Sequence, residues 1–176
     1  MDKTGKITKT AHIINIWNPN RPTKPNQTNT NQYKLIFKMT PPPATPKNPR
    51  DVVIVSAVRT PLCRARKGAL SKVSPSTLLS TAFKGCFAKI PINNAISPAE
   101  IQDICIGNVL CPTDAIVARM AQLSAGIPYT TPVSTTNRQC SSGLQAVAHI
   151  ANAISAGQID IGIAGGFESM STNAMH

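Results

Sequence analysis

The sequence predicts an α/β domain that follows a separate N-terminal segment. Residues 51–58, DVVIVSAV, form a β-branched run typical of a strand buried on both faces, as in a parallel sheet. Further along, short apolar runs alternate with longer segments that begin at capping residues and end at glycine, as helices do. Strands that alternate with helices build layered sheets, so this order predicts the fold class.

Residues 1–50 differ from the rest of the chain in charge and composition. They contain nine Lys and Arg against a single acid, Asp2, and so hold +8 of the net charge of +11. Eight of the fifteen prolines lie there, and neither helical nor strand periodicity persists. We therefore predict a disordered basic leader over residues 1–50 and one ordered domain over residues 51–176.

The role of this leader stays open from the sequence. A solvated tail, or sequence upstream of a later start such as Met39, is favoured over a targeting peptide or a nucleic-acid-binding arm. Its two arginines are few for a mitochondrial transit peptide. Its three aromatic residues are too scattered for a nucleic-acid surface, so no nucleic acid is expected as a partner.

Capping residues mark where the helices begin. Ser74 precedes Pro75, and Ser97 precedes Pro98 with Glu100 at the capping-box spacing. In the first helix, Leu79 and Phe83 belong to the face that points inward. The predicted elements are helices over 75–89, 115–125 and 141–156, a short helix from 98, and strands over 51–58, 103–109 and 159–164.

The helix predicted over 141–156 has no charged side chain. The sequence holds no charge between Arg138 and Asp160, and Ser, Gly, Ala and Asn fill the positions where a surface helix carries Lys and Glu. A helix without a charged face is a buried helix. We therefore expect another domain or subunit to supply a layer that covers it.

The five cysteines predict free thiols. Their number is odd and no CxxC pair occurs, which argues against a disulfide framework and against a zinc site. No apolar run approaches the roughly 18 residues of a membrane-spanning helix, so no membrane span is expected. No signal-peptide pattern is present, which favours a reducing intracellular compartment. The cysteines are Cys63, Cys86, Cys105, Cys111 and Cys140.

Cys140 lies where a polar loop meets the start of the charge-free helix. Free N–H groups at a helix N-terminus and the positive end of its dipole stabilise a thiolate and can hold an oxyanion. Acyl transfer through a thioester needs both. A small buried cysteine without chemistry is an equally good interpretation of this position on the residues alone.

Four ordered segments carry a resemblance to a known family. NRQCSSGLQAV around Cys140, VVIVSAVRTP at 52–61, DICIGNVL at 103–110 and DIGIAGGFESMS at 160–171 resemble the N-terminal half of a thiolase. The runs RTPLCRARKG at 59–68 and ARMAQ at 118–122 are most similar to peroxisomal 3-ketoacyl-CoA thiolases. The resemblance covers nearly all of residues 51–171.

The resemblance implies a fold, an activity and a nucleophile. The fold is a βαβαβ layered half with the cysteine helix in the central layer of a five-layered α-β-α-β-α arrangement. The activity is acetyl-CoA C-acyltransferase in fatty-acid β-oxidation, with Cys140 as the acyl-accepting residue and its N–H in the oxyanion hole. Coenzyme A and acyl-CoA act as substrates, with no permanently bound cofactor and no metal, and a homodimer is expected.

The sequence offers no base for Cys140. His149 lies nine residues further along the same helix, roughly 13 Å away along its axis, and His12 and His176 are interpreted as incidental. In thiolases the activating His and a second acid/base Cys come from the C-terminal half. The chain alone is therefore expected to be inactive.

Other candidate residues are interpreted as structural. The four remaining cysteines are expected to be structural residues without chemical reactivity. Gly162, Gly165 and Gly166 do not precede a helix, as the glycines of a dinucleotide-binding site would. A run of four basic residues after the first strand is interpreted as a solvated charged loop rather than as a phosphate-binding site. That run comprises Arg59, Arg64, Arg66 and Lys67.

Two alternative functions remain beside the acyltransferase. One is a non-catalytic fragment that associates with full-length thiolase, and the other is a ketoacyl-synthase-like condensing enzyme. The resemblance favours the peroxisome, although neither a terminal Ser-Lys-Leu type signal nor the N-terminal nonapeptide pattern is found. The mitochondrion and the cytosol remain alternatives.

Overall fold

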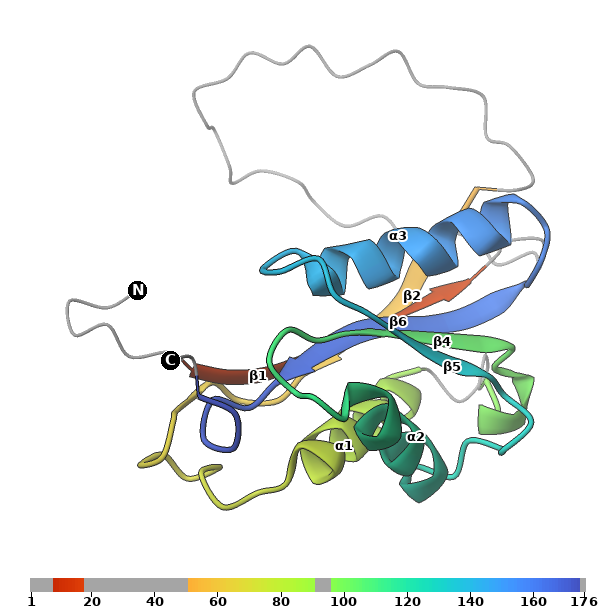
Figure 1. The fold of residues 1–176 in the computed structure, drawn as a ribbon. Helices are drawn as coiled ribbons and strands as arrows, with labels where there is room; N and C mark the ends of the chain where they lie inside the picture. The colour runs from red at the N-terminus through yellow and green to blue at the C-terminus, as the bar shows by residue number, and fades with distance from the viewer. Residues whose placement is uncertain (1–7, 18–50, 91–95, 175–176) are drawn as a thin grey trace, which may run out of the picture.

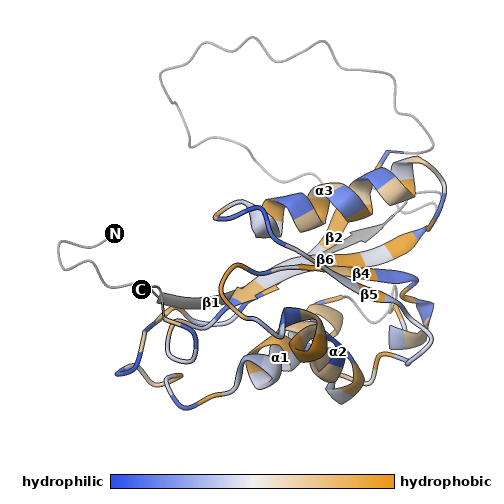
Figure 2. Ribbon diagram, in the orientation of Figure 1, coloured by the Kyte–Doolittle hydropathy of each residue, from blue (hydrophilic) through white to orange (hydrophobic). Residues whose placement is uncertain are grey.

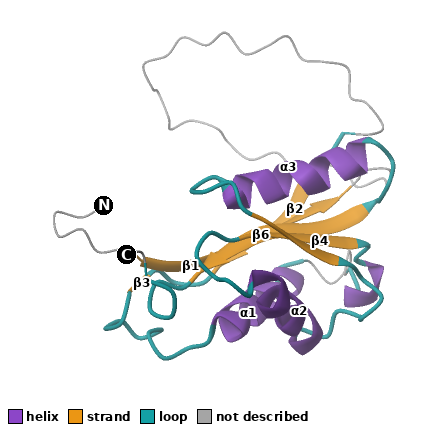
Figure 3. Ribbon diagram, viewed as in Figure 1, coloured by secondary structure: helices purple, strands orange, loops and turns teal. Residues whose placement is uncertain are grey.

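The structure is a computed structural model that describes residues 8–17, 51–90 and 96–174. A mixed β-sheet is covered by two helices on one face and by one helix on the other (Figure 1; Figure 3). Helices α1 (Pro75–Ala88) and α2 (Asp114–Ser124) cover the first face, and α3 (Ser142–Ser155) covers the second. The strands are β1 (Thr8–Trp17), β2 (Val53–Arg59), β3 (Cys63–Arg64), β4 (Asp103–Gly107), β5 (Val133–Thr136) and β6 (Ile161–Glu168).

The strands are ordered β2-β1-β6-β4-β5, and β3 pairs with the start of β1. Strand β4 runs parallel to both β5 and β6. Strand β1 runs antiparallel to both of its long neighbours, β2 and β6. The four strands β2, β6, β4 and β5 therefore share one direction, and only β1 opposes them within this sheet.

The predicted helix starts are confirmed. The Ser74 side chain accepts a hydrogen bond from the Thr77 amide at the start of α1, with Pro75 in the first turn. Ser97 and Glu100 form the expected capping box at a short 3-10 helix, Pro98–Glu100. Helices α2 and α3 are followed by Gly126 and Gly157, which both adopt positive φ angles.

Two expectations about the first part of the chain are wrong. Thr8–Trp17 falls within the predicted disordered leader, yet it forms an interior strand of the sheet, between β2 and β6. The rest of that leader lies outside the described residues. Strand β2 is an edge strand rather than one buried on both faces, and Ile54 is 58% exposed. A short stretch of sequence cannot show which strand lies inside the sheet and which at its edge when the pairing partner lies far away in the chain.

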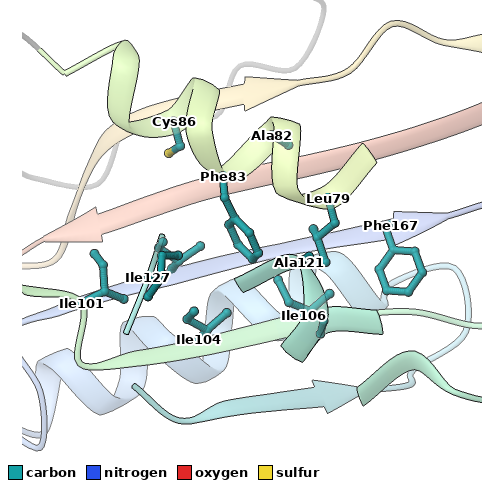
Figure 4. Packing of buried hydrophobic residues seen from close by; sticks show 12 residues of the cluster. Leu79, Ala82, Phe83, Cys86, Ile101, Ile104, Ile106, Ala121, Ile127 and Phe167 are labelled. Carbon is teal, nitrogen blue, oxygen red and sulfur yellow. The ribbon is translucent and has the colours of Figure 1, made fainter. Parts of the chain in front are cut away.

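The larger core lies between the sheet and helices α1 and α2. Leu79 and Phe83 of α1 point toward Ile104 and Ile106 of β4 (Figure 4). The face toward α3 holds smaller side chains and forms a separate cluster, with Cys105, Ala146 and Ala164 alongside Ile150 and Ile154. Among the described residues, no helix is long and apolar enough to cross a membrane.

Candidate functional site

Cys140 lies at the end of the loop that connects β5 to α3. It comes just before Ser141, the residue that caps α3, and its thiol is free and exposed. The helix that follows begins at Ser142 and places its N-terminus beside the thiol. The structure therefore places Cys140 where the sequence predicted it, at the start of the helix.

A network of short hydrogen bonds holds the loop before Cys140. The Ser142 hydroxyl accepts from the Arg138 amide at 2.8 Å and donates to the Gln139 carbonyl at 2.6 Å. The Asn137 side-chain oxygen accepts from the Gln139 amide at 3.0 Å. Gln139 has a φ of 50°, a left-handed conformation that is uncommon for a residue with a side chain. This turn fixes the direction in which the chain enters the helix.

Gly107 lets the start of α3 approach the sheet closely. A Cβ atom on Gly107 would lie 2.4 Å from the Ser142 carbonyl carbon and 2.5 Å from the Gly143 amide nitrogen. A Cβ on the neighbouring Gly166 would lie 2.9 Å from the Gly107 carbonyl oxygen. Two strands therefore need glycine at the level where the helix that follows Cys140 begins. A glycine within a strand pattern is a sequence signal for such close approach.

Polar side chains cross-link the chain at the carboxyl ends of β4 and β6. Asn108 donates from its side-chain nitrogen to the Phe167 carbonyl at 2.6 Å, and its oxygen accepts from the Cys111 amide at 2.7 Å. The Glu168 carboxylate accepts from the Val109 amide at 3.0 Å. In open α/β sheets, ligands bind at the carboxyl ends of the strands. Cys140 therefore lies at the edge where a binding site is expected.

His149 does not face Cys140. Its Nδ1 atom lies 3.7 Å from the Cys105 sulfur of strand β4, although His149 as a whole is exposed. Burial raises the pKa of the Cys105 thiol, a hydrogen bond with Ser134 opposes that rise, and the charge of Asp103 adds to it. Burial likewise raises the pKa of Asp103, opposed by a hydrogen bond from the Ile104 amide.

Over residues 51–90 and 96–174, no imidazole or carboxylate makes a hydrogen bond with the Cys140 sulfur. His176 lies outside those ranges, and His12 contributes to strand β1.

The other predicted residues are dispersed over the fold. Cys86 and Cys105 are buried, and Cys63 and Cys111 are partly buried. The residues of the basic run are all exposed, and the Arg66 amide donates to the Ser171 hydroxyl at 2.7 Å. The described part of the chain holds no group of three potential metal ligands.

The sequence analysis missed several residues around Cys140. Asn108 follows β4 directly and Glu168 ends β6, and polar residues at strand ends were a usable signal in the strings DICIGNVL and GGFESMS. Strand β5 was missed because VSTT is short and polar. Gly107 had a signal in its strand pattern, although its contact with α3 depends on the tertiary structure.

The fold and the site define a class of protein: an α/β domain that presents an exposed thiol at the N-terminus of a packed helix, beside the carboxyl ends of parallel strands. A family model described as "Thiolase, N-terminal domain" matches residues 52–176. The chain belongs to the thiolase family, as the motifs around Cys140 predicted.

Individual relatives agree with that assignment. The chain is 50% identical over 125 residues to 3-ketoacyl-CoA thiolase 1, peroxisomal, of Arabidopsis thaliana, covering 70% of this chain and 27% of that protein. It is 49% identical over 122 residues to the peroxisomal 3-ketoacyl-CoA thiolase of Homo sapiens, covering 69% and 28%. The chain thus spans about a quarter of the length of these relatives.

A solved structure supports the same fold. The crystal structure of the dimeric peroxisomal thiolase of Saccharomyces cerevisiae superposes with a TM-score of 0.68 at 44% identity. The similarity covers 73% of this chain and 33% of that one.

Proposed function

We propose that this chain carries the acyl-accepting part of an acetyl-CoA C-acyltransferase of fatty-acid β-oxidation. The observation that carries the proposal is the exposed Cys140 thiol at the N-terminus of α3, within a domain of the thiolase family. Amide groups at a helix N-terminus stabilise both a thiolate and an oxyanion. The substrates are a 3-ketoacyl-CoA and coenzyme A, without a resident cofactor or metal.

The proposed reaction has two steps. The Cys140 thiolate attacks the 3-keto carbon, the bond between C2 and C3 breaks, and its electron pair stays on C2 of the departing acetyl-CoA, which then takes up a proton. The shortened acyl group is now a thioester on the Cys140 sulfur. A second coenzyme A thiolate attacks this thioester carbonyl, which releases the shortened acyl-CoA and restores the Cys140 thiolate.

The acid and base for these proton transfers are proposed to lie outside the described residues. His149 is the one histidine that the structure describes on a helix, and it contacts Cys105 rather than Cys140. The chain alone is therefore proposed to accept an acyl group without sustained turnover. The names of the relatives also support a peroxisomal location and, from the yeast structure, a dimeric assembly as further proposals.

Intact-protein mass spectrometry after incubation with a short 3-ketoacyl-CoA tests the proposal. We expect one acyl adduct on the wild-type chain and on Cys111→Ser, a matched control at a partly buried cysteine. We expect none on Cys140→Ser. An adduct that persists in Cys140→Ser, or its absence from a folded wild-type chain, would refute Cys140 as the acyl acceptor.

A further inference from the structure

One interior strand of the sheet, β1, comes from outside the thiolase match. The match covers residues 52–176, which include β2, β4, β5 and β6, whereas β1 is formed by Thr8–Trp17. Yet β1 lies between β2 and β6 in the strand order (Figure 1). Within the described part of the chain, β2 has no strand partner other than β1.

Strand β1 pairs along nearly its whole length on both sides. It pairs with β6 from Thr10 opposite Glu168 to Trp17 opposite Ile161, without interruption. It pairs with β2 from His12 opposite Arg59 to Trp17 opposite Val53, with one irregularity after Asn15. Both ladders are antiparallel, so one segment satisfies backbone groups of two strands that would otherwise be separate.

The connection from β1 to β2 is far longer than a hairpin. It runs through residues 18–52, whereas antiparallel neighbours are usually joined by about 2–5 residues. The position of β1 is therefore set by its two ladders rather than by a tight turn. Backbone pairing with β2 and β6 therefore holds Thr8–Trp17, as it would hold a peptide that binds to a sheet as an added strand.

Strand β2 is also attached to the domain by contacts other than β1. The Ser56 hydroxyl donates to the Cys86 carbonyl at 2.9 Å, and the Lys89 side chain donates to the Ala57 carbonyl at 3.3 Å. These contacts anchor β2 to helix α1 and its C-terminal cap. The space between β2 and β6 is therefore bounded by strands that are each attached to the rest of the fold.

We propose that β2 and β6 form a strand-acceptor site and that its occupant is residues Thr8–Trp17 of the same chain. The segment acts as an intramolecular ligand by β-augmentation, in which main-chain hydrogen bonds supply the binding energy. It holds β2 in the sheet and closes the site to other extended segments. The proposal does not depend on acyl transfer at Cys140.

Cleavage of the connection tests the proposal on the full chain. A protease recognition sequence replaces residues 27–33, and the cleaved protein is examined by native mass spectrometry. We expect the N-terminal piece to remain bound to the C-terminal piece in equal number, whether the protein is a monomer or a dimer. Release of that piece would overturn the proposal.

Hydrogen exchange provides a second test without cleavage. Ile14 lies opposite Ala57 of β2 and Ala164 of β6, so Ile14→Pro removes a donor at the middle of the ladders. We expect amides of β2 to exchange about tenfold faster or more, since a ladder hydrogen bond and the strand geometry are lost together. The control Gln27→Pro should leave β2 unchanged. Equal exchange of the β2 amides in the two variants would overturn the proposal. If Ile14→Pro does not fold, the cleavage experiment decides the question.

Discussion

The two faces of the sheet are packed in different ways. On the first face, α1 contributes Leu79 and Phe83, which are fully buried, and α2 packs through alanines. On the second face, the first turn of α3 approaches Gly107 closely, and two isoleucines of α3 pack on the sheet further along the helix. Figure 2 shows hydrophobic and hydrophilic residues alternating along α3. The first face contributes most of the apolar burial, and the second places the start of a helix beside Cys140.

This difference separates the residues that stabilise the domain from those that position Cys140. Substitutions on the α1–α2 face remove apolar contacts and should lower the free energy of unfolding. Substitutions where α3 meets the sheet should also change the surroundings of Cys140. Four predictions test this distinction, and they are ordered from the largest expected effect to the smallest.

Phe83→Ala should have the largest effect on stability. Phe83 is 0% exposed and lies in the core between α1 and β4, so its truncation removes apolar burial and leaves a cavity. We expect a loss of about 3–5 kcal/mol in the free energy of unfolding, measured by urea denaturation. The control Ile116→Ala, on the exposed side of α2, should change it by about 0.5 kcal/mol or less. Equal losses would contradict the assignment of the core.

Gly107→Ala should destabilise the face toward α3. The added methyl group would meet backbone atoms of Ser142 and Gly143, which cannot move without the helix. We expect a loss of about 1–3 kcal/mol in the free energy of unfolding, as for other overpacked sites.

Gly143→Ala is the matched control for that change. A Cβ on Gly143 has no heavy atom within 4 Å, although Gly143 belongs to the same contact. We expect no loss, or a gain of about 0.5–1 kcal/mol because alanine favours the helix. A loss in Gly143→Ala as large as that in Gly107→Ala would show that close approach is not the cause.

The pH dependence of stability should report the burial of Cys105. Its folded pKa is raised above the ordinary value of 9.0, first by desolvation. As pH rises through about 9, the unfolded chain loses this proton before the folded chain does, so the free energy of unfolding falls. Cys105→Ala should show a shallower decrease between about pH 8 and 10. Parallel decreases in denaturation experiments would contradict a raised pKa.

Leu144→Ser should have the smallest effect. Leu144 lies on α3 but is 73% exposed, because its side chain points away from the sheet. We expect a change of about 0.5 kcal/mol or less in the free energy of unfolding. A loss above about 2 kcal/mol, typical of a buried leucine, would show that this side of α3 is covered in solution.

The sequence predicted local features better than sheet order. Proline after serine located α1 and the capping box, and glycine located the ends of α2 and α3, because these signals act over a few residues. The position of β1 between β2 and β6 depends on pairing between residues about 150 positions apart, such as Thr10 with Glu168. Hydrophobic periodicity within a short stretch of sequence carries no information on pairing between such distant residues.

The candidate site divides in the same way. Cys140 was predictable because a polar loop, a cysteine and a charge-free helix follow one another in the sequence. The contact between Cys105 and His149 was not predicted, because it joins a strand to a helix 44 residues further on. The prediction that α3 is buried holds for the side with Ile150 and Ile154, whereas Leu144 and His149 on other sides are exposed.

Rates of cysteine alkylation, measured residue by residue in the folded chain, test most directly whether the α3 face positions Cys140. We predict that Cys140 reacts fastest of the five cysteines. Gly107→Ala should slow Cys140 because it displaces the helix N-terminus, whereas Gly143→Ala should not. In urea, the five rates should converge. If Cys140 reacts no faster than the partly buried Cys63 and Cys111, or if Gly107→Ala leaves its rate unchanged, the account is contradicted.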